Sequence, residues 1–147
     1  MIREGTIEEA VNVSLMIPEF EDPYKVDEYQ KRLLNRPHLV LIATNDNQLV
    51  GFKVGYALDE GIFYSWMGGV IPDYRKKGIA QRLLEHQEAW AILHEYKKIF
   101  VKTLNKHRGM LTFLIKNGYN IVGFTPNVSV EKNQIRFQKI LNKKLSH

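Results

Sequence analysis

A short basic segment near the middle of the chain has the composition of an anion-binding site. It reads Arg75-Lys76-Lys77-Gly78-Ile79-Ala80-Gln81 and stands between a strand-like run and a helix-like run. The first N–H groups of a helix lack an acceptor within the helix, and the helix dipole adds about half a positive charge there. Gly78 and Ala80 keep side-chain bulk away from those groups. The segment therefore predicts a site for a phosphate or a pyrophosphate.

Two common phosphate-binding motifs do not match this segment. The chain contains no Gly-Lys-Ser or Gly-Lys-Thr, which a Walker A loop requires, and no G-x-G-x-x-G dinucleotide fingerprint. A plain strand–helix connection with solvated lysines stays open as the alternative interpretation of the local pattern.

The residue types give little support to nucleophilic or metal chemistry. The chain has no cysteine, which excludes a cysteine nucleophile, a disulfide framework and a Cys-ligated metal. His86 and His94 fall on one predicted helix, but the paired histidines of an H-E-x-x-H motif are missing. We therefore expect no metal site.

Length and composition predict one globular domain over residues 1–147. The chain is 44% hydrophobic and 25% charged. A domain of this size buries about 68–70% of the surface of its unfolded chain, so it needs no covalent or metal cross-link. No apolar run approaches the roughly 20 residues of a membrane span, and the start Met1-Ile2-Arg3-Glu4 does not resemble a signal peptide. We expect a cytoplasmic protein without a membrane partner.

The net charge of +5 divides unevenly along the chain. Residues 1–70 carry 6 basic and 11 acidic side chains, a net of −5, whereas residues 71–147 carry 15 basic and 5 acidic side chains, a net of +10. The second half thus fits either an anion site or a nucleic-acid surface, and ordinary solvated surface is the third explanation.

The pattern around the basic segment predicts an α+β fold. Thr6 and Glu9 form a capping box ahead of the first helix, and Asn45-Asp46-Asn47 is typical of a turn between two strands. The predicted order is β-α-α-β-β-β-α-β-α-β-β, a mixed, mostly antiparallel sheet of about seven strands flanked by about four helices. After a short strand ending at Arg3, the predicted ranges are helices at 7–16, 25–35, 78–95 and 107–117, and strands at 38–44, 48–58, 62–71, 99–104, 119–124 and 129–141.

The segment 75–80 resembles the R/Q-x-x-G-x-G/A signature of the GCN5-related N-acetyltransferase (GNAT) family. Val70-Ile71-Pro72-Asp73-Tyr74 is similar to the lead-in of that signature. Thr103-Leu104-Asn105, followed by a helix and Gly118-Tyr119, resembles the segment that follows the fifth strand of the family. Together with the element order, the resemblance covers nearly the whole chain.

This resemblance implies acetyl-CoA as the acyl donor. In the family, the strand before the signature separates from its neighbour, and the pantetheine arm pairs with its backbone, which here is that of Gly69, Val70 and Ile71. The Val70 N–H would polarise the thioester carbonyl, and Asn105 would contact the pantetheine arm or a nearby water. The pyrophosphate would lie on the backbone amides of Lys76, Lys77, Gly78, Ile79, Ala80 and Gln81, with the charge of Arg75 beside it.

The usual acid and base of the family are missing. The position of the family's tyrosine holds Leu114, and the position of its glutamate holds Tyr64. Tyr64 is expected to orient the acceptor or to relay through water, because a phenol with a pKa of about 10 is a poor base at neutral pH. Without an obvious base, the site favours an α-amine, of which about a tenth is free base at pH 7, over a lysine-type amine.

The expected acceptor is the primary amine of a small molecule or a peptide. The acidic loop Glu19-Phe20-Glu21-Asp22 is expected near the acceptor entrance, with Asp59 and Glu60 as further candidates for that surface. A homodimer paired through the C-terminal strands is a further expectation. The alternatives are a non-catalytic CoA-binding domain and, with less support, a nucleic-acid-binding module.

Overall fold

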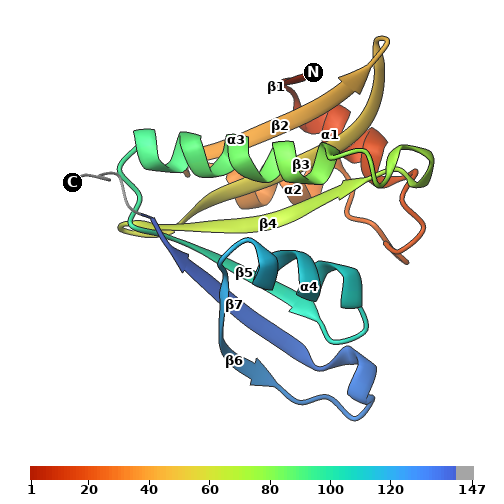
Figure 1. Ribbon diagram of the computed structural model, residues 1–147. Coiled ribbons are helices and arrows are strands. Elements are labelled where there is room, and N and C mark those ends of the chain that lie inside the picture. Colours follow the sequence, from red (N-terminus) through yellow and green to blue (C-terminus); the bar gives the residue numbers. More distant parts are fainter. Residues whose placement is uncertain (142–147) are drawn as a thin grey trace.

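The structure, a computed structural model, describes residues 1–141. A seven-stranded sheet in the order β1-β2-β3-β4-β5-β7-β6 forms its centre (Figure 1). Of the neighbouring pairs, β4 and β5 are parallel and the others antiparallel, so the predicted element order and mixed sheet are confirmed. The strands are β1 (Ile2–Glu4), β2 (His38–Asn45), β3 (Gln48–Asp59), β4 (Ile62–Val70), β5 (Lys98–Leu104), β6 (Asn120–Thr125) and β7 (Gln134–Ile140).

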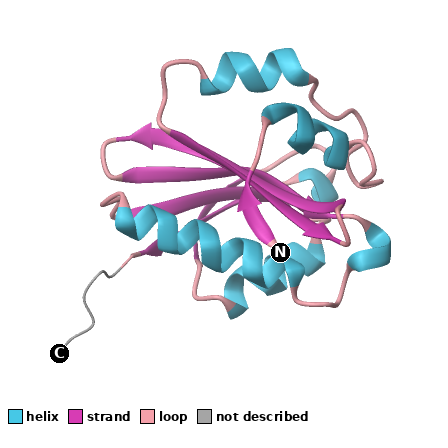
Figure 2. Ribbon diagram, turned by 90° about the horizontal axis from the view of Figure 1, so that it is seen from above, coloured by secondary structure: helices cyan, strands magenta, loops and turns pink. Residues whose placement is uncertain are grey.

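Helices cover both faces of the sheet (Figures 1 and 2). Helices α1 (Ile7–Ser14) and α2 (Val26–Leu33) lie on one face, and α3 (Ile79–Leu93) and α4 (Arg108–Lys116) lie on the other. A methyl group placed on Gly51 would lie 3.3 Å from Ile79 and Leu83, whereas one on Gly69 would meet Ile17. These two contacts identify which strand residues face α3 and which face α1.

Local signals in the sequence explain several element boundaries. The Glu9 N–H donates to Thr6 Oγ1 at 3.1 Å, and the Thr6 N–H donates to Glu9 Oε1 at 3.0 Å, which confirms the capping box. Asp46 and Asn47 both have positive φ, 50° and 65°, as a tight turn between β2 and β3 requires. The first helix and the first hairpin are therefore determined by neighbouring residues alone.

The predicted strand over 129–141 is wrong in its first part. Val130–Lys132 form a 3-10 helix (η2), and β7 begins only at Gln134. The Asn133 side chain accepts a hydrogen bond from the Asn127 N–H at 2.7 Å, and the Asn127 side chain accepts one from the Ser129 N–H at 3.0 Å. These side chains satisfy backbone donors locally, so the chain turns instead of extending. The first helix is also shorter than predicted, since it ends at Ser14 and not at Met16.

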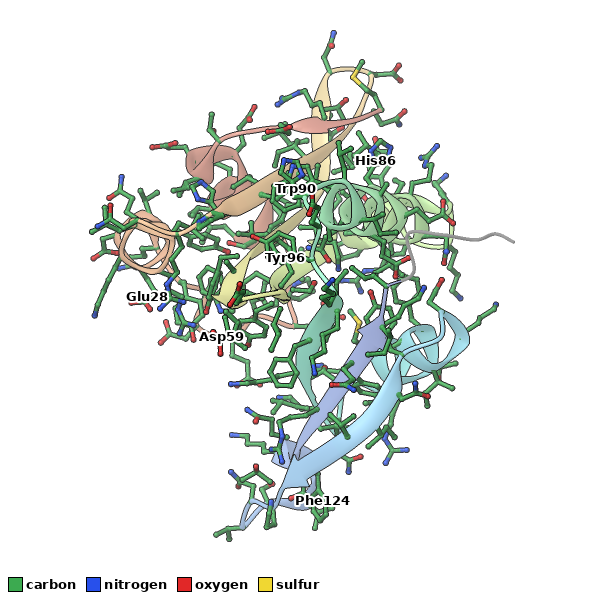
Figure 3. All side chains as sticks on the ribbon, turned by 90° about the vertical axis from the view of Figure 1, so that its left-hand side faces the viewer. Glu28, Asp59, His86, Trp90, Tyr96 and Phe124 are labelled. Atoms are coloured by element: carbon green, nitrogen blue, oxygen red, sulfur yellow. The ribbon has the colours of Figure 1, made fainter. Side chains whose placement is uncertain are left out.

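The core lies between the sheet and its helices. Phe52, Phe63 and Phe137 are fully buried in it. On the α3 face, the Phe63 ring centroid is 5.2 Å from those of Trp90 and of Tyr96, and these two residues lie close together in Figure 3. The packing fixes α3 against β4, the strand that precedes the basic segment.

Residues 1–141 contain neither a helix that could span a membrane nor a cluster of metal-ligating side chains. None of the helices in this range is long and apolar enough to cross a membrane. No group of three or more His, Cys, Asp or Glu side chains in the same range is arranged to hold a metal ion.

Candidate active site

The two parallel strands at the centre of the sheet separate part of the way along. Residues Ile62 to Ser65 of β4 pair with Lys98 to Val101 of β5, and the pairing stops there although β4 continues to Val70 (Figure 1). On its other side β4 stays paired with β3, with one extra residue at Trp66. The result is a wedge-shaped split, closed at Ser65 and open toward the basic segment.

The register of β3 and β4 determines which backbone groups face this split. The Ile71 N–H donates to Val50 O at 2.9 Å, and Val70 lies opposite Gly51. In an antiparallel pair, alternate residues turn their N–H and C=O groups toward and away from the partner strand. Gly68 and Val70 therefore face the split, whereas Gly69 and Ile71 face β3. By this alternation β3 uses the backbone groups of Gly69 and Ile71, so of the three residues expected to pair with a ligand, Val70 is the one whose N–H faces the split.

The Arg75 guanidinium does not point at the predicted phosphate site. Its Nε donates to Val70 O at 2.9 Å, and its two terminal nitrogens donate to the Glu19 carboxylate at 2.8 and 2.9 Å. This pairing lowers the pKa of Glu19. Arg75 thus occupies the Val70 C=O, leaves the Val70 N–H directed into the split and attaches the loop before α2 to the end of β4.

The backbone of the basic segment forms a row of unused donors. Lys76 and Gly78 have φ values of 63° and 81°, and Gly78 is the N-cap of α3. The first N–H with a helical acceptor is that of Arg82, which donates to Gly78 O at 3.1 Å. The N–H groups of Lys76 to Gln81 have no acceptor among residues 1–141. Consecutive free donors at a helix start fit an anionic group such as a pyrophosphate.

The side chains of this segment have different surroundings. Lys76 and Lys77 are exposed and have no acidic partner among the described residues. Gln81 Nε2 donates to Glu85 Oε2 at 2.9 Å and to Asn117 Oδ1 at 2.7 Å, so this side chain connects α3 to the end of α4. The two lysines are the side chains that remain available to an anion.

Asn105 lies at the open end of the split but is held by the opposite hairpin. Its N–H donates to Asn133 O at 2.8 Å, and its Nδ2 donates to Val130 O at 3.3 Å. Its own C=O accepts a hydrogen bond from Arg108 Nε at 2.9 Å. Asn105 therefore fixes the end of β5 against η2 and the start of α4.

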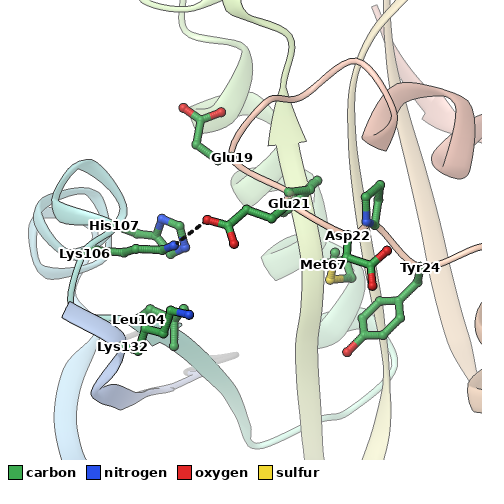
Figure 4. A pocket seen from close by; sticks show the side chains of 11 residues that line it. Glu19, Glu21, Asp22, Tyr24, Met67, Leu104, Lys106, His107 and Lys132 are labelled. Atoms are coloured by element: carbon green, nitrogen blue, oxygen red, sulfur yellow. Dashed lines mark hydrogen bonds and ion pairs between the residues drawn. The ribbon is translucent and has the colours of Figure 1, made fainter. Parts of the chain in front are cut away.

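A cavity of about 340 Å³ occupies the mouth of the split (Figure 4). Met67 of β4 and Leu104 of β5 form two of its walls, and the acidic loop covers it. Its lining comprises Glu19, Phe20, Glu21, Asp22, Pro23, Tyr24, Met67, Leu104, Lys106, His107 and Lys132. The predicted acceptor loop therefore does border a cavity, whereas Asp59 and Glu60 lie at the opposite end of β4 and are not part of it.

The acidic loop carries fewer free charges than its composition suggests. Glu19 is paired with Arg75, and Glu21 Oε2 lies 3.1 Å from Lys106 Nζ (Figure 4). Lys106 lowers the pKa of Glu21 accordingly. Asp22 is the lining carboxylate without an ion pair among residues 1–141. A cationic acceptor would meet mainly this carboxylate.

His107 is a cavity residue to which the sequence had assigned no chemistry. Burial lowers its pKa from the ordinary 6.5, and the neighbouring Lys106 acts in the same direction, while Glu19 and Glu21 oppose them. The imidazole is thus mostly neutral at pH 7 and able to accept a proton. Its position directly after Asn105-Lys106, at the start of a helix, was the available signal.

The tyrosines near the split are poor proton carriers. Burial raises the pKa of Tyr64 to about 12. Tyr119, which is almost fully buried, donates its hydroxyl to Glu88 Oε2 at 2.7 Å, and burial together with Glu88 raises its pKa strongly. Leu114 packs in the core at 2% exposure. None of these three side chains replaces the missing acid or base at neutral pH.

Lys53 is the second residue that sequence reasoning missed. It lies on β3 opposite Gly68, and its side chain extends over this glycine. Burial lowers the pKa of Lys53 to about 8, an effect that the more distant Glu88 carboxylate partly offsets. The signal in the sequence was a lone lysine between Phe52 and Val54 in an otherwise apolar strand.

Comparison with known proteins agrees with this geometry. The sequence matches the acetyltransferase (GNAT) family over residues 7–124. The chain therefore belongs to the GNAT family of acetyltransferases, a class of acyltransferases. Among the curated proteins compared, none matches the sequence.

Solved structures of this family share the fold. The ribosomal-protein-S18-alanine N-acetyltransferase from Escherichia coli has a TM-score of 0.83 at 13% identity, over 100% of this chain and 99% of that chain. Ard1 from Thermoplasma volcanium has a TM-score of 0.82 at 17% identity, over 97% of both chains. An aminoglycoside 6'-N-acetyltransferase complexed with coenzyme A has a TM-score of 0.78 at 20% identity, over 99% of both chains. At these identities the likeness concerns the fold.

The backbone conformation at Gly78 allows a direct test. Cβ atoms added at Gly78 and at Gly109 would both point into open space, but Gly78 has a φ of 81° whereas Gly109 lies within α4. We expect Gly78→Ala to lower the free energy of unfolding by about 1 kcal/mol, because L-residues disfavour this region. Gly109→Ala should raise it by roughly 0.5–1 kcal/mol. Urea denaturation measures the free energy of unfolding of both variants. Equal changes in the two would contradict the expectation that an L-residue is disfavoured at position 78.

Proposed function

We propose that this protein is an acetyl-CoA-dependent N-acetyltransferase that passes the acetyl group directly to a primary amine of a small molecule or a peptide. The observation that supports this most is the split between β4 and β5, which opens onto the free donors of Lys76 to Gln81. A long anionic ligand with a peptide-like arm fits such a combination of sheet edge and helix start.

The donor half of the proposed site is mostly backbone. The N–H groups of Lys76 to Gln81, with Lys76 and Lys77 beside them, would hold the pyrophosphate. The N–H of Val70, nearer the open end of the split, would pair with the pantetheine arm. The backbone N–H of Gly68, which lies deeper in the split, would polarise the thioester carbonyl. The amine nitrogen then forms a bond to the carbonyl carbon, the carbon–sulfur bond breaks, and the electron pair leaves on sulfur.

The acceptor half of the proposed site is the cavity under the acidic loop. Asp22 would attract a cationic amine, and the neutral His107 imidazole would accept the proton that the amine loses. With no cysteine in the chain, the proposal includes no cysteine acyl-enzyme. The single domain over residues 1–147, the cytoplasmic location and the absence of a metal and of a nucleic-acid partner stay predictions.

The central experiment is thermal denaturation with acetyl-CoA, CoA, AMP or DNA, followed by thiol release on a panel of amines. We expect acetyl-CoA at about 100 times its Kd to add about 2.7 kcal/mol of stability. Lys77→Glu should weaken CoA binding roughly tenfold, since a charge-assisted hydrogen bond contributes about 1.5 kcal/mol. Lys31→Glu on the exposed side of α2 is the matched control and should bind as the wild type does.

The same experiment separates the alternatives. Turnover on amines, faster for α-amines than for ε-amines at pH 7, supports the proposal. Stabilisation by CoA without turnover on any amine would favour a non-catalytic CoA-binding domain. A response to DNA alone would favour a nucleic-acid-binding module.

The role of His107 predicts a pH dependence. We expect kcat to fall as the pH drops through the pKa of His107, which burial lowers from its ordinary value, because protonation removes the accepting nitrogen. His107→Gln should lower kcat at neutral pH by about 10²-fold and remove this acid limb. His38→Gln, at an exposed position on β2, is the control. An unchanged kcat in His107→Gln would remove the histidine from the mechanism.

A homodimer paired through β6 is part of the proposal. This strand is the outer edge of the sheet, and Ile121, Val122 and Phe124 on it are 59%, 49% and 57% exposed. Figure 3 shows Phe124 at the far end of the hairpin. An unpaired apolar edge can pair with its copy across a twofold axis.

Light scattering after gel filtration tests this pairing. We expect a dimer for the wild type and a monomer for Phe124→Lys, because the charge would be buried between the two edges. Leu93→Lys replaces an equally apolar residue that is 77% exposed on α3, and it should leave the dimer intact. A wild-type protein that is monomeric at every concentration tested would contradict the dimer.

A further inference from the structure

Lys53 lies against the backbone at the inner end of the split. It is directly opposite Gly68 in the antiparallel pair of β3 and β4, so both residues belong to the α3 face of the sheet. A Cβ added at Gly68 would lie 3.4 Å from Lys53 Cγ and 3.6 Å from Lys53 Nζ. The missing side chain of Gly68 thus gives the lysine its path across β4, toward the edge that faces the split.

The Lys53 ammonium is a cation without a counterion in contact. It has no hydrogen bond and no ion pair within residues 1–141. The charge that acts on it is Glu88 on α3, but this carboxylate already accepts the Tyr119 hydroxyl and lies 3.2 Å from Lys139 Nζ of β7. The side chain of Lys53 is partly buried, and a cation that is partly removed from water costs stability unless an anion accompanies it.

The direction of the split indicates where a transient anion would form. Its open end leads to the donors at the start of α3, where the phosphates of the proposed donor would lie. Its closed end is at Ser65, and Gly68 is the split-facing residue nearer to that end. A donor bound along β4 with its phosphates outside would therefore carry its sulfur inward, toward Gly68 and Lys53.

We propose that the Lys53 ammonium stabilises the CoA thiolate as it leaves the thioester. This inference rests on the proposed N-acetyltransferase function. The electron pair of the broken carbon–sulfur bond stays on sulfur, opposite the ammonium, while the proton of the attacking amine goes to the acceptor side of the site. The thiolate then takes a proton from Lys53, and water returns one to the lysine nitrogen.

The energetics suit this role. Taken separately, a thiol has a pKa of about 8.5 and Lys53 has one of about 8, so the two groups are closely matched, and bringing them together favours the thiolate and the ammonium. Near pH 7 the lysine is mostly charged, which is the form that favours a thiolate. Leu114, Tyr119 and Tyr64 are unsuited to stabilise or protonate the leaving thiolate.

The test measures the ionisation of bound CoA and does not depend on turnover. The ultraviolet absorbance of the CoA thiolate is titrated from about pH 6 to about pH 10, a range that includes both groups. In the wild-type complex the midpoint should lie about one pH unit or more below that of free CoA, as expected for a nearby opposite charge. Lys53→Met and Lys53→Gln should restore the free value, whereas Lys53→Arg should keep the lowered one.

Two controls make the outcome specific. Lys31→Met makes the same change of charge on the exposed side of α2 and should titrate as the wild type does. The thermal midpoint of each variant without ligand reports folding. It should not fall in Lys53→Met, since this change removes a partly buried cation that has no ion-pair partner among residues 1–141. If that variant does not fold, the comparison of Lys53→Gln with Lys53→Arg decides.

Each result has one meaning. Equal thiolate midpoints in the wild type and Lys53→Gln would overturn the inference and leave the proposed function intact. A wild-type protein that does not bind CoA would overturn both. An acetyl group found on Lys53 by mass spectrometry, after incubation with acetyl-CoA, would make the lysine a nucleophile and would also overturn it.

Discussion

The extra residue at Trp66 determines most of the geometry at the centre of this protein. Because β4 holds one residue more than β3 at this point, the strand bends while it stays paired with β3. Pairing with β5 ends one residue earlier, at Ser65. The Trp66 ring packs against α2 and the loop before it. Its centroid is 4.8 Å from that of Tyr29 and 5.5 Å from that of Tyr24, and the Arg32 guanidinium lies 4.6 Å from it. The aromatic packing on the α2 face therefore helps to keep β4 apart from β5 beyond Ser65, where the cavity lies.

The uneven charge of the two halves of the chain has a structural counterpart. Glu19 and Glu21 of the acidic half bind Arg75 and Lys106 of the basic half, at both sides of the cavity. Partly exposed ion pairs of this kind contribute roughly 0–1 kcal/mol each. They connect the loop to the residues beside the split, but they contribute little to the stability of the fold. Most of the remaining basic excess is ordinary surface, so the charge balance by itself is no argument for nucleic acid.

The parts that the sequence predicted well depend on short-range signals. The capping box at Thr6 and the turn at Asp46-Asn47 involve residues at most a few positions apart, and both occur as expected. The signature at 75–80 likewise combines a strand end, a glycine and a helix start within one segment. Such features need no knowledge of the tertiary structure, and they were sufficient for the element order and the family.

The parts that were wrong or missed depend on pairing between distant residues. The direction of the Gly69 and Ile71 backbone groups follows from the register with β3 and cannot be derived from β4 alone. Arg75 lies 56 positions from its partner Glu19, so its charge seemed available to a phosphate. Lys53 and Lys139, both on the α3 face, also differ in a way that only the tertiary structure shows. Lys139 forms an ion pair with Glu88 at 3.2 Å, but Lys53, opposite a glycine, has no ion-pair partner among the described residues. A fold under selection for stability alone would favour an apolar residue at position 53. The proposed thiolate would give the Lys53 cation, beside the split, a partner that the described residues do not supply.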